Sequence, residues 1–385
     1  MKTKSKIPAL RFKGFTDAWE QRKLGELTTS FSGGTPSAGN SSYYKGDIPF
    51  IRSSEINSDK TELFLTEAGL KNSSAKMVSV GDILYALYGA TSGEVGISQI
   101  NGAINQAILA IKPCDGYNSH FLMQWLKLQK QKIIDKYLQG GQGNLSGSIV
   151  KNLVLNVPSY EEQQKIGSFF KQLDNTIALH QRKCEQTKEL KKTMLQKMFP
   201  KKGERIPEIR FPEFTDEWEE KKLGEVVERE IKGKAKANMQ GTKSIYLETE
   251  YLNGGETTFV DSDADIEEDD ILILWDGSQA GTVYHGFFGA LGSTLKAYRP
   301  KESGKFVYYQ LVAHQEMIFQ RYRTPNIPHV IKTFTDEFSV FTTSLSEQER
   351  IGNFFKHLDT LIALHQSKCD SLKELKKTLL RQLFV

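Results

Sequence analysis

The chain has 385 residues, enough for two or three domains that each bury a core of their own. Its hydrophobic content of 38%, charged content of 25% and formal charge of +4 are those of a soluble, mildly basic globular protein. No apolar run reaches the roughly 18 residues of a membrane span, and the basic start lacks the apolar stretch of a secretory signal. The three cysteines are too few and too scattered for a disulfide framework or a four-ligand zinc site. We therefore expect a cytoplasmic, multidomain protein without a structural metal, for which charge alone permits nucleic-acid binding without demonstrating it.

Taken in chain order, short β-rich runs separated by Gly, Asn and Ser clusters predict strands at residues 83–88 and 107–111, followed by a helix near 120–137. A long amphipathic helix is expected within 158–200. The second half repeats this order, with strands at 271–275 and 295–298, a helix near 305–322, and a long helix within 344–385. The fold class is therefore α/β (mixed α+β), with domains at 1–157 and 201–343.

The chain is a tandem duplication. Residues 7–27 and 206–226, the two leading segments, are identical at 13 of 21 positions, and residues 162–199 and 347–384 at 24 of 38. The stretches between them have diverged and differ by 14 residues in length. The repeated segments are similar and the stretches between them differ. This organisation suits a protein that binds the same partner at two places while contacting two different targets, such as DNA half-sites.

The two long helices carry apolar side chains at alternating spacings of four and three, which is the seam of a left-handed coiled coil. A helix of about 39 residues, roughly 58 Å long, cannot bury this stripe alone, so we expect the two copies to pair antiparallel. Since His180 and His365 each precede a cysteine by four residues, they could be metal ligands, or form a polar layer that sets the register. The seam positions chosen are Ile166, Phe170, Leu173, Ile177, His180, Ile351, Phe355, Leu358, Ile362 and His365.

The sequence resembles the specificity subunits of type I restriction-modification enzymes over essentially its whole length. The motifs are Phe31-Ser-Gly-Gly-Thr-Pro-Ser, Gly81-Asp-Ile-Leu, Ala103-Ile-Asn-Gln, Gly143-Asn-Leu-Ser and the repeated Glu-Gln-x-x-Ile-Gly at the start of the long helices. The resemblance implies two target-recognition domains that read a bipartite double-stranded DNA target. It also implies two docked methyltransferase (modification) subunits, joined by motor-nuclease (restriction) subunits. S-adenosylmethionine, ATP and Mg would then belong to those partners, and this chain would hold no cofactor.

Candidate DNA-contacting residues fall into three kinds, each of which could also be an ordinary solvated surface. Amides and arginines in two corresponding loops suit base edges or phosphates, two Gly-rich turns suit the same face, and basic clusters suit phosphates. The loops supply Gln139, Gln142, Asn144, Arg321, Tyr322, Arg323 and Asn326; the turns supply Tyr88, Thr91, Ser278 and Gln279; the basic clusters supply Tyr43, Lys45, Arg52, Lys232, Lys234, Lys236 and Lys243.

Catalytic motifs are missing from the sequence. It has no P-loop and no S-adenosylmethionine Gly-rich loop, and Asn326-Ile-Pro-His is not the Asn-Pro-Pro-aromatic motif of adenine methyltransferases. Asp216 and Glu219 could be read as the acidic pair of a nuclease, although a structural helix start fits them better. A non-catalytic DNA-reading chain is therefore the favoured hypothesis, against a nuclease or a coiled-coil adaptor that binds proteins alone.

Overall fold

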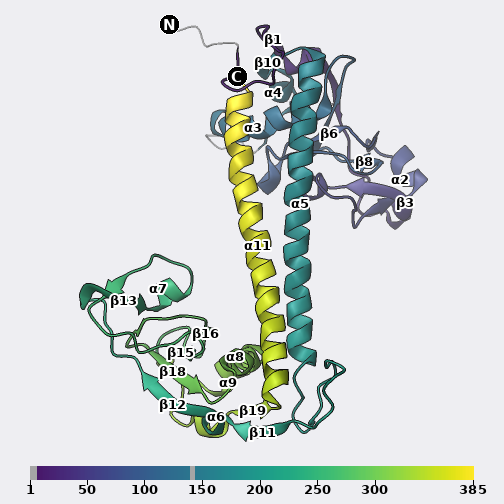
Figure 1. Cartoon of the computed structure of the whole chain (residues 1–385). Coiled ribbons are helices and arrows are strands. Elements are labelled where there is room, and N and C mark those ends of the chain that lie inside the picture. Colours follow the sequence, from purple (N-terminus) through teal and green to yellow (C-terminus); the bar gives the residue numbers. More distant parts are fainter. Residues whose placement is uncertain (1–6, 139–143) are drawn as a thin grey trace. The chain divides into compact units, whose positions relative to one another are not determined.

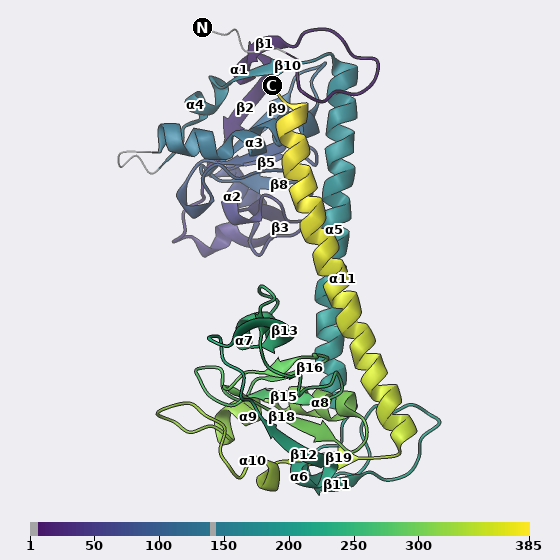
Figure 2. The ribbon, with the colours of Figure 1, turned by 60° about the vertical axis from the view of Figure 1, so that its left-hand side comes forward.

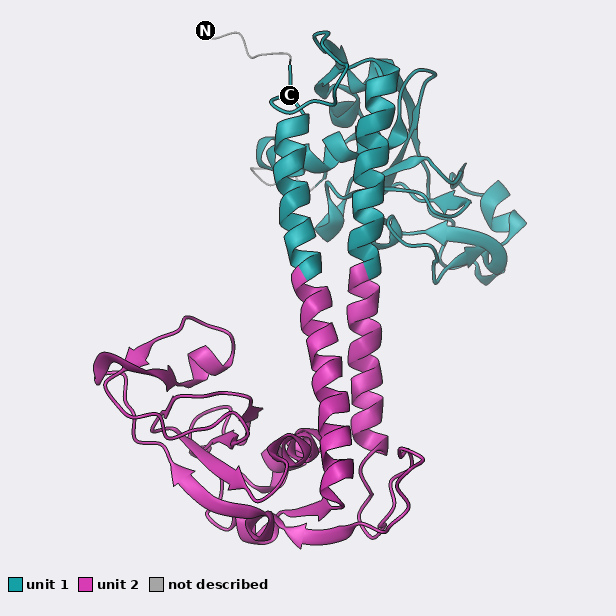
Figure 3. Cartoon of the chain, in the orientation of Figure 1, with its two compact units in different colours: residues 1–179, 368–385 teal, residues 180–367 magenta. Residues whose placement is uncertain are grey.

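A computed structural model describes residues 7–138 and 144–385 of the chain. The chain forms two compact units, one of residues 1–179 with 368–385 and one of residues 180–367, coloured separately in Figure 3. Each unit combines strands and short helices with one segment of each long helix, α5 (Tyr160–Lys197) and α11 (Leu345–Leu383), labelled in Figure 1. The boundaries predicted from the sequence placed each long helix outside the domains. In the structure, each long helix contributes one segment to each unit.

Unit 1 contains a four-stranded antiparallel sheet in the order β2 (Thr28–Ser32), β9 (Ile108–Pro113), β6 (Ile83–Ala86) and β7 (Val95–Ile97). A second sheet has the order β4 (Phe64–Leu65), β3 (Tyr44–Ile51), β8 (Gly102–Ile104) and β5 (Lys76–Val78), with β3 and β8 parallel. The strands β1 (Glu20–Lys23) and β10 (Val154–Val157) pair antiparallel. The helices and helical turns of this unit are α1 (Leu24–Leu27), η1 (Ser41–Tyr43), η2 (Ser53–Glu55), α2 (Glu67–Lys71), η3 (Gly89–Thr91), α3 (Ser119–Tyr137) and α4 (Gly147–Lys151).

Unit 2 repeats this plan. Its four-stranded sheet has the order β12 (Val227–Lys232), β18 (Leu295–Pro300), β15 (Ile271–Leu274) and β16 (Val283–His285), which Figure 2 shows beside α8 (Gly304–Ala313). The smaller sheet is β14 (Phe259–Val260), β13 (Gln240–Leu247) and β17 (Ala290–Leu291), and β11 (Glu219–Lys222) pairs with β19 (Ser339–Thr342). The remaining helices are α6 (Leu223–Val226), α7 (Thr249–Leu252), α9 (Gln315–Arg321) and α10 (Phe334–Glu337).

The central strands β6 and β15 are buried on both faces, which explains their continuous apolar sequences. In β15, Ile271 and Ile273 face the core that includes α8 and the long helices, while Leu272 and Leu274 face the smaller sheet. Each unit is therefore layered, with helices on one side of the larger sheet and the smaller sheet on the other. Asp270, directly before β15, forms an ion pair with Arg299 of β18 at 2.8 Å. This acid of the repeated Asp-Ile-Leu run therefore stabilises the pairing of β15 with β18.

An equivalent aromatic cluster joins each domain to its helix segments. In unit 1, Trp19 of the leading segment, Phe121 of α3 and Phe384 beyond α11 lie with ring centroids 5.1 to 6.2 Å apart. In unit 2, Phe199 and Trp218 surround Phe306 of α8 at 5.8 and 5.4 Å. The Trp and Phe positions that recur in both repeats therefore pack each domain against its long-helix segments, and each aromatic side chain buries a large apolar area there.

The two long helices run antiparallel within each unit, as the seam predicts. In unit 2, Lys191 of α5 contacts Asp359 of α11 at 2.5 Å, and Tyr309 of α8 donates a hydrogen bond to the same carboxylate at 2.8 Å. In unit 1, Lys376 contacts Asp174 at 2.6 Å, and Gln124 of α3 donates to it. The aspartates therefore fix both the register of the helices and the attachment of the neighbouring domain.

One expected helix is interrupted. The sequence predicted a single helix near 305–322, but α8 ends at Ala313 and α9 begins at Gln315, with His314 between them at φ −108° and ψ 16°. The side-chain amide of Gln315 donates a hydrogen bond from Nε2 to the carbonyl of Gly281 at 2.7 Å, which ties α9 to the turn after β15. Tertiary anchoring of this kind overrides the local helical pattern.

Candidate nucleic-acid interface

The first candidate site in unit 1 is the turn that follows β6. Tyr88 forms an isolated antiparallel bridge with Asn144, and the amide of Leu145 donates to the carbonyl of Leu87 at 2.9 Å. These contacts bring together the turn and the end of the loop, which are far apart in the sequence. Thr91 belongs to η3, which lies in the turn before β7. Gln139 and Gln142, the other two amides expected here, lie outside the described residues.

Unit 2 brings together the corresponding turn and loop. The amide of Gly277 donates to the carbonyl of Pro328 at 2.9 Å, and Val330 donates to Trp275 at the same distance. Arg323 reaches from the loop to the carbonyl of Ser278 at 3.2 Å. The two segments that the sequence proposed separately therefore form one surface in this unit too.

Glycine is required in both turns by backbone geometry. Gly93 and Gly281 have φ values of +80° and +93°, in the left-handed region that disfavours side chains. A Cβ on Gly281 would also lie 3.0 Å from Ile318 of α9, and one on Gly93 would lie 3.2 Å from Lys130 of α3. The backbone conformation and the packing of each turn on the domain helix therefore explain these glycines. The candidate DNA-contacting groups are the other residues of the turns.

The side chains on the unit 2 surface differ in availability. Gln279, Arg321 and Asn326 are exposed, whereas Tyr322 packs its ring on Phe334 and Phe338 at 5.4 and 5.5 Å. Tyr322 therefore serves the core more than the surface. Arg323 is half-buried, with its guanidinium 4.8 Å from the ring centroid of Phe319. The exposed amides and Arg321 remain the best-placed groups to contact base edges or phosphates.

Sequence reasoning missed Ile327, which is 78% exposed beside Asn326. Among the exposed large apolar side chains of the described residues, Ile327 has the highest exposed fraction, and an apolar side chain can contact the methyl group of thymine. The only signal in the sequence was its position between Asn326 and Pro328, which does not distinguish exposure from burial.

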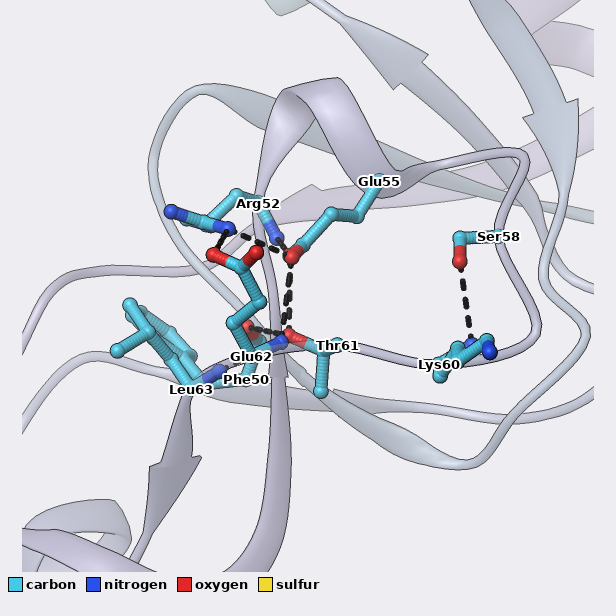
Figure 4. Close-up of polar contacts among 8 residues, drawn as sticks. All are labelled: Phe50, Arg52, Glu55, Ser58, Lys60, Thr61, Glu62 and Leu63. Carbon is cyan, nitrogen blue, oxygen red and sulfur yellow. Dashed lines mark hydrogen bonds and ion pairs between the residues drawn. The ribbon is translucent and has the colours of Figure 1, made fainter. Parts of the chain in front are cut away.

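Arg52, expected as a phosphate contact, is already engaged by two carboxylates, as Figure 4 shows. Its guanidinium donates to Glu55 at 2.8 Å and to Glu62 at 2.6 Å, and these bonds raise the pKa of Arg52. Burial opposes ionisation of Glu55, but hydrogen bonds from Arg52, Thr61 and the Glu62 amide lower its pKa to about 2. The cluster closes a loop of unit 1, so Arg52 has a structural role that its charge alone did not indicate.

The remaining basic candidates are mostly exposed. Lys232, Lys234 and Lys236 are exposed along the end of β12 and the segment after it, and Lys243 lies 2.7 Å from Asp263. In unit 1, Tyr43 is half-buried, while Lys45 is exposed and has a φ of 63°. These side chains stay candidates for phosphate contacts.

The coil seam is largely apolar and buried, with a polar step at its histidines. The seam side chains Ile166, Phe170, Ile351, Phe355 and Leu358 are at most 4% exposed. The Nδ1 atoms of His180 and His365 lie 3.1 Å apart with both rings half-buried. This arrangement fits the polar-layer interpretation, in which one ring donates to the other.

Glu219, one of the two acids of the nuclease hypothesis, is paired with a neighbouring lysine. Glu219 forms an ion pair with Lys221 at 2.8 Å, and this hydrogen bond lowers the pKa of Glu219. Within residues 7–138 and 144–385, no cluster of three or more His, Cys, Asp or Glu side chains is arranged to hold a metal ion. Helices in the same ranges are all too short or too polar to cross a membrane.

The architecture is two copies of a strand-rich domain, each packed on segments of both long helices. The family model for the type I restriction modification DNA specificity domain matches residues 16–189 and again residues 215–374. The chain therefore belongs to this family, and each repeat carries one copy of its domain.

Relatives agree with this assignment. The chain is 29% identical over 194 residues to the type I restriction enzyme MjaVIII specificity subunit of Methanocaldococcus jannaschii, covering 48% of the chain and 45% of the relative. It is 20% identical over 394 residues to the putative MjaX specificity subunit of the same organism, covering 95% and 92%. In its alignments with the MjaVIII and MjaIX subunits, the chain spans about half the length of these relatives.

A solved structure has the same fold. The crystal structure of the type I restriction-modification system S subunit from M. genitalium superposes with a TM-score of 0.73 at 19% identity, covering 98% of this chain and 99% of that one. The predicted fold class of two similar domains joined through long antiparallel helices is confirmed.

Proposed function

We propose that this chain is the non-catalytic subunit that reads a bipartite double-stranded DNA target for a type I restriction-modification complex. Unit 1 would read one half of the target and unit 2 the other. The observation that carries the proposal is the equivalent pairing of a Gly-rich turn with a distant loop in both units, bearing different side chains.

The difference in chemistry between the surfaces favours two different half-sites. Around Asn144, unit 1 offers Tyr88 and Thr91, which are neutral. Unit 2 offers Arg321 with the amides of Gln279 and Asn326. Amides suit adenine and arginine suits guanine in the major groove, so the same scaffold can specify different bases.

Scaffolding of two methyltransferase subunits is supported by apolar side chains repeated on the coil surface. Leu179 and its counterpart Leu364 are 47% and 58% exposed, and Leu190 and its counterpart Leu375 are 43% and 48% exposed. Such leucines on otherwise polar helix faces are suited to cover by a partner helix. Duplication of the pattern favours two identical partners, with S-adenosylmethionine, ATP and Mg used by the methyltransferase and restriction subunits.

Mapping methylated adenines across the host genome tests the proposal. Deleting the gene for this chain should remove methylation at one two-part motif and leave other motifs unchanged. Retention of every motif would reject the proposal. The rivals are separated by two assays on the purified chain: an adaptor would show no sequence-dependent, salt-sensitive binding to duplex DNA, and a nuclease would cut DNA with Mg²⁺ alone.

A further inference from the structure

Each unit has a polar cavity at the same place in its fold. The cavities measure about 370 Å³ in unit 1 and about 330 Å³ in unit 2. In either unit, the walls come from the leading segment, the turn before the domain helix (α3 or α8), and the first residues at the start of the long helix (α5 or α11). The unit 1 cavity is lined by Asp17, Glu20, Arg22, Asp115, Ser159 and Gln163. Their counterparts in the unit 2 cavity are Asp216, Glu219, Lys221, Glu302, Ser344 and Gln348.

The cavity walls are held together by a buried glutamine. Gln163 is 1% exposed, donates to the carbonyl of Pro158 at 3.0 Å and accepts from the amide of Asn118 at 3.1 Å. Gln348, 2% exposed, donates to the carbonyl of Thr343 at 2.8 Å and also to Glu302. Both glutamines are buried and hydrogen-bonded to the segments that form the cavity walls, so they help to hold these walls in place.

The cavities are negatively charged although the whole chain has a formal charge of +4. In unit 1, three carboxylates face one guanidinium, which gives a net charge of −2. In unit 2, Glu217 and Glu225 join the three shared acids, and Lys221 and Lys301 oppose these five, which gives −3. DNA phosphates are repelled by such a surface, so a nucleic-acid occupant is excluded by charge.

The chemical types of the counterpart residues that line the cavities are the same in both units, whereas those of the DNA-facing surfaces differ. Acids at the positions of Asp17, Glu20 and Asp115 recur in unit 2, a cation recurs at Arg22, and the glutamine recurs, while the turn and loop side chains differ. Binding of the same kind of partner group in both cavities would explain why these lining residues recur. We infer that each cavity receives a basic side chain, arginine or lysine, presented by a methyltransferase subunit, one subunit to each unit.

This inference rests on the proposed scaffolding function and adds a second contact to it, separate from the exposed leucines. It is tested by neutralising each cavity in the full-length chain: Asp17→Asn with Glu20→Gln in unit 1, and Asp216→Asn with Glu219→Gln in unit 2. All four side chains are exposed, so folding should be preserved. A matched control is Asp59→Asn with Glu67→Gln, two exposed acids of unit 1 outside the cavity.

The readout is titration with the methyltransferase subunit of the same system, followed by sedimentation velocity at several salt concentrations. We expect either cavity variant to keep one site and to weaken the other about tenfold, with a shallower salt dependence at that site. The control should bind like the unaltered chain. Cavity variants that bind two subunits within about twofold of the unaltered chain would overturn the inference alone. If the unaltered chain binds no methyltransferase subunit, the scaffolding function is rejected and the inference with it.

Discussion

Replacing Glu347 by glutamine should destabilise unit 2 strongly, because its carboxylate neutralises a buried arginine. The Glu347 side chain is 0% exposed and that of Arg210 is 9% exposed. Arg210 donates to the two carboxylate oxygens at 2.7 and 2.8 Å, which raises the pKa of Arg210. The pair fastens the leading segment of the second repeat to the first turn of α11, and Arg11 with Glu162 repeats it in unit 1.

The expected cost follows from burial. Removing one partner of a buried pair leaves an uncompensated charge and costs about 3–5 kcal/mol. Arg210 also lies 5.9 Å from the ring of Trp218, which retains part of its stabilisation. We therefore expect about 3 kcal/mol for Glu347→Gln. Replacing the pair together, by Arg210→Met and Glu347→Leu, should recover at least about 2 kcal/mol of that loss, because an apolar pair has no charge to desolvate.

Native-state hydrogen exchange with mass spectrometry measures this locally. Peptides from the start of α11 should exchange faster in Glu347→Gln, while peptides of β6 and β9 in unit 1 serve as an internal reference. Glu217→Gln is the matched control, since its ion pair with Arg205 is 64% and 70% exposed and should contribute nothing measurable. A loss below about 1 kcal/mol in Glu347→Gln, or one equal to the control, would show that the Arg210–Glu347 pair does not stabilise unit 2 in this way.

Three further predictions concern individual residues. Asn144→Ala and Arg321→Ala should each relax a different half of the DNA motif by about 1–3 kcal/mol per base contact; binding selections should reveal this, and a uniform loss across sequences would instead mark phosphate contacts. Arg52→Gln should raise the pKa of Glu55 from about 2 towards its ordinary value, as an NMR titration would show. Since that pKa is depressed in the folded chain, the ionised Glu55 stabilises its loop above the ordinary glutamate pKa, and this stabilisation disappears as pH falls towards 2; an unshifted titration in the variant would contradict the role of Arg52. Gly281→Ala should cost about 1–3 kcal/mol in thermal unfolding because its φ is +93°; an unchanged transition would show that the turn adapts.

The features that the sequence predicted are those encoded in local patterns. The central strands were identifiable because residues such as Ile271 to Leu274 form an unbroken apolar run. The coil was identifiable because its spacing of four and three recurs in both copies. The Gly-rich turns and the later loops were each identified as candidate DNA-contacting segments, but their pairing was not predicted; the bridges at Tyr88 and Asp276 bring them together.

The features that the sequence did not reveal depend on contacts between distant residues. Arg52 is bound by Glu55 three residues later and by Glu62 ten residues later, and the presence of these acids in the sequence does not show that the guanidinium is engaged and not free to bind phosphate. Tyr322 reads as a surface residue of a basic loop, yet aromatic neighbours from α10 turn it inward. The cavities combine Asp17, Asp115 and Gln163, three positions that share no sequence motif and meet only when the leading segment packs against the long helix.

Exchanging one domain between related chains tests the central claim most directly. Residues 28–156 would be replaced by the equivalent segment of a relative that directs methylation at another motif, and methylated adenines would be mapped in cells that carry the hybrid. We expect one half of the two-part motif to change to that of the relative while the other half stays the same. A hybrid that methylates with both halves changed, or with neither changed, would contradict the assignment of one half-site to each unit.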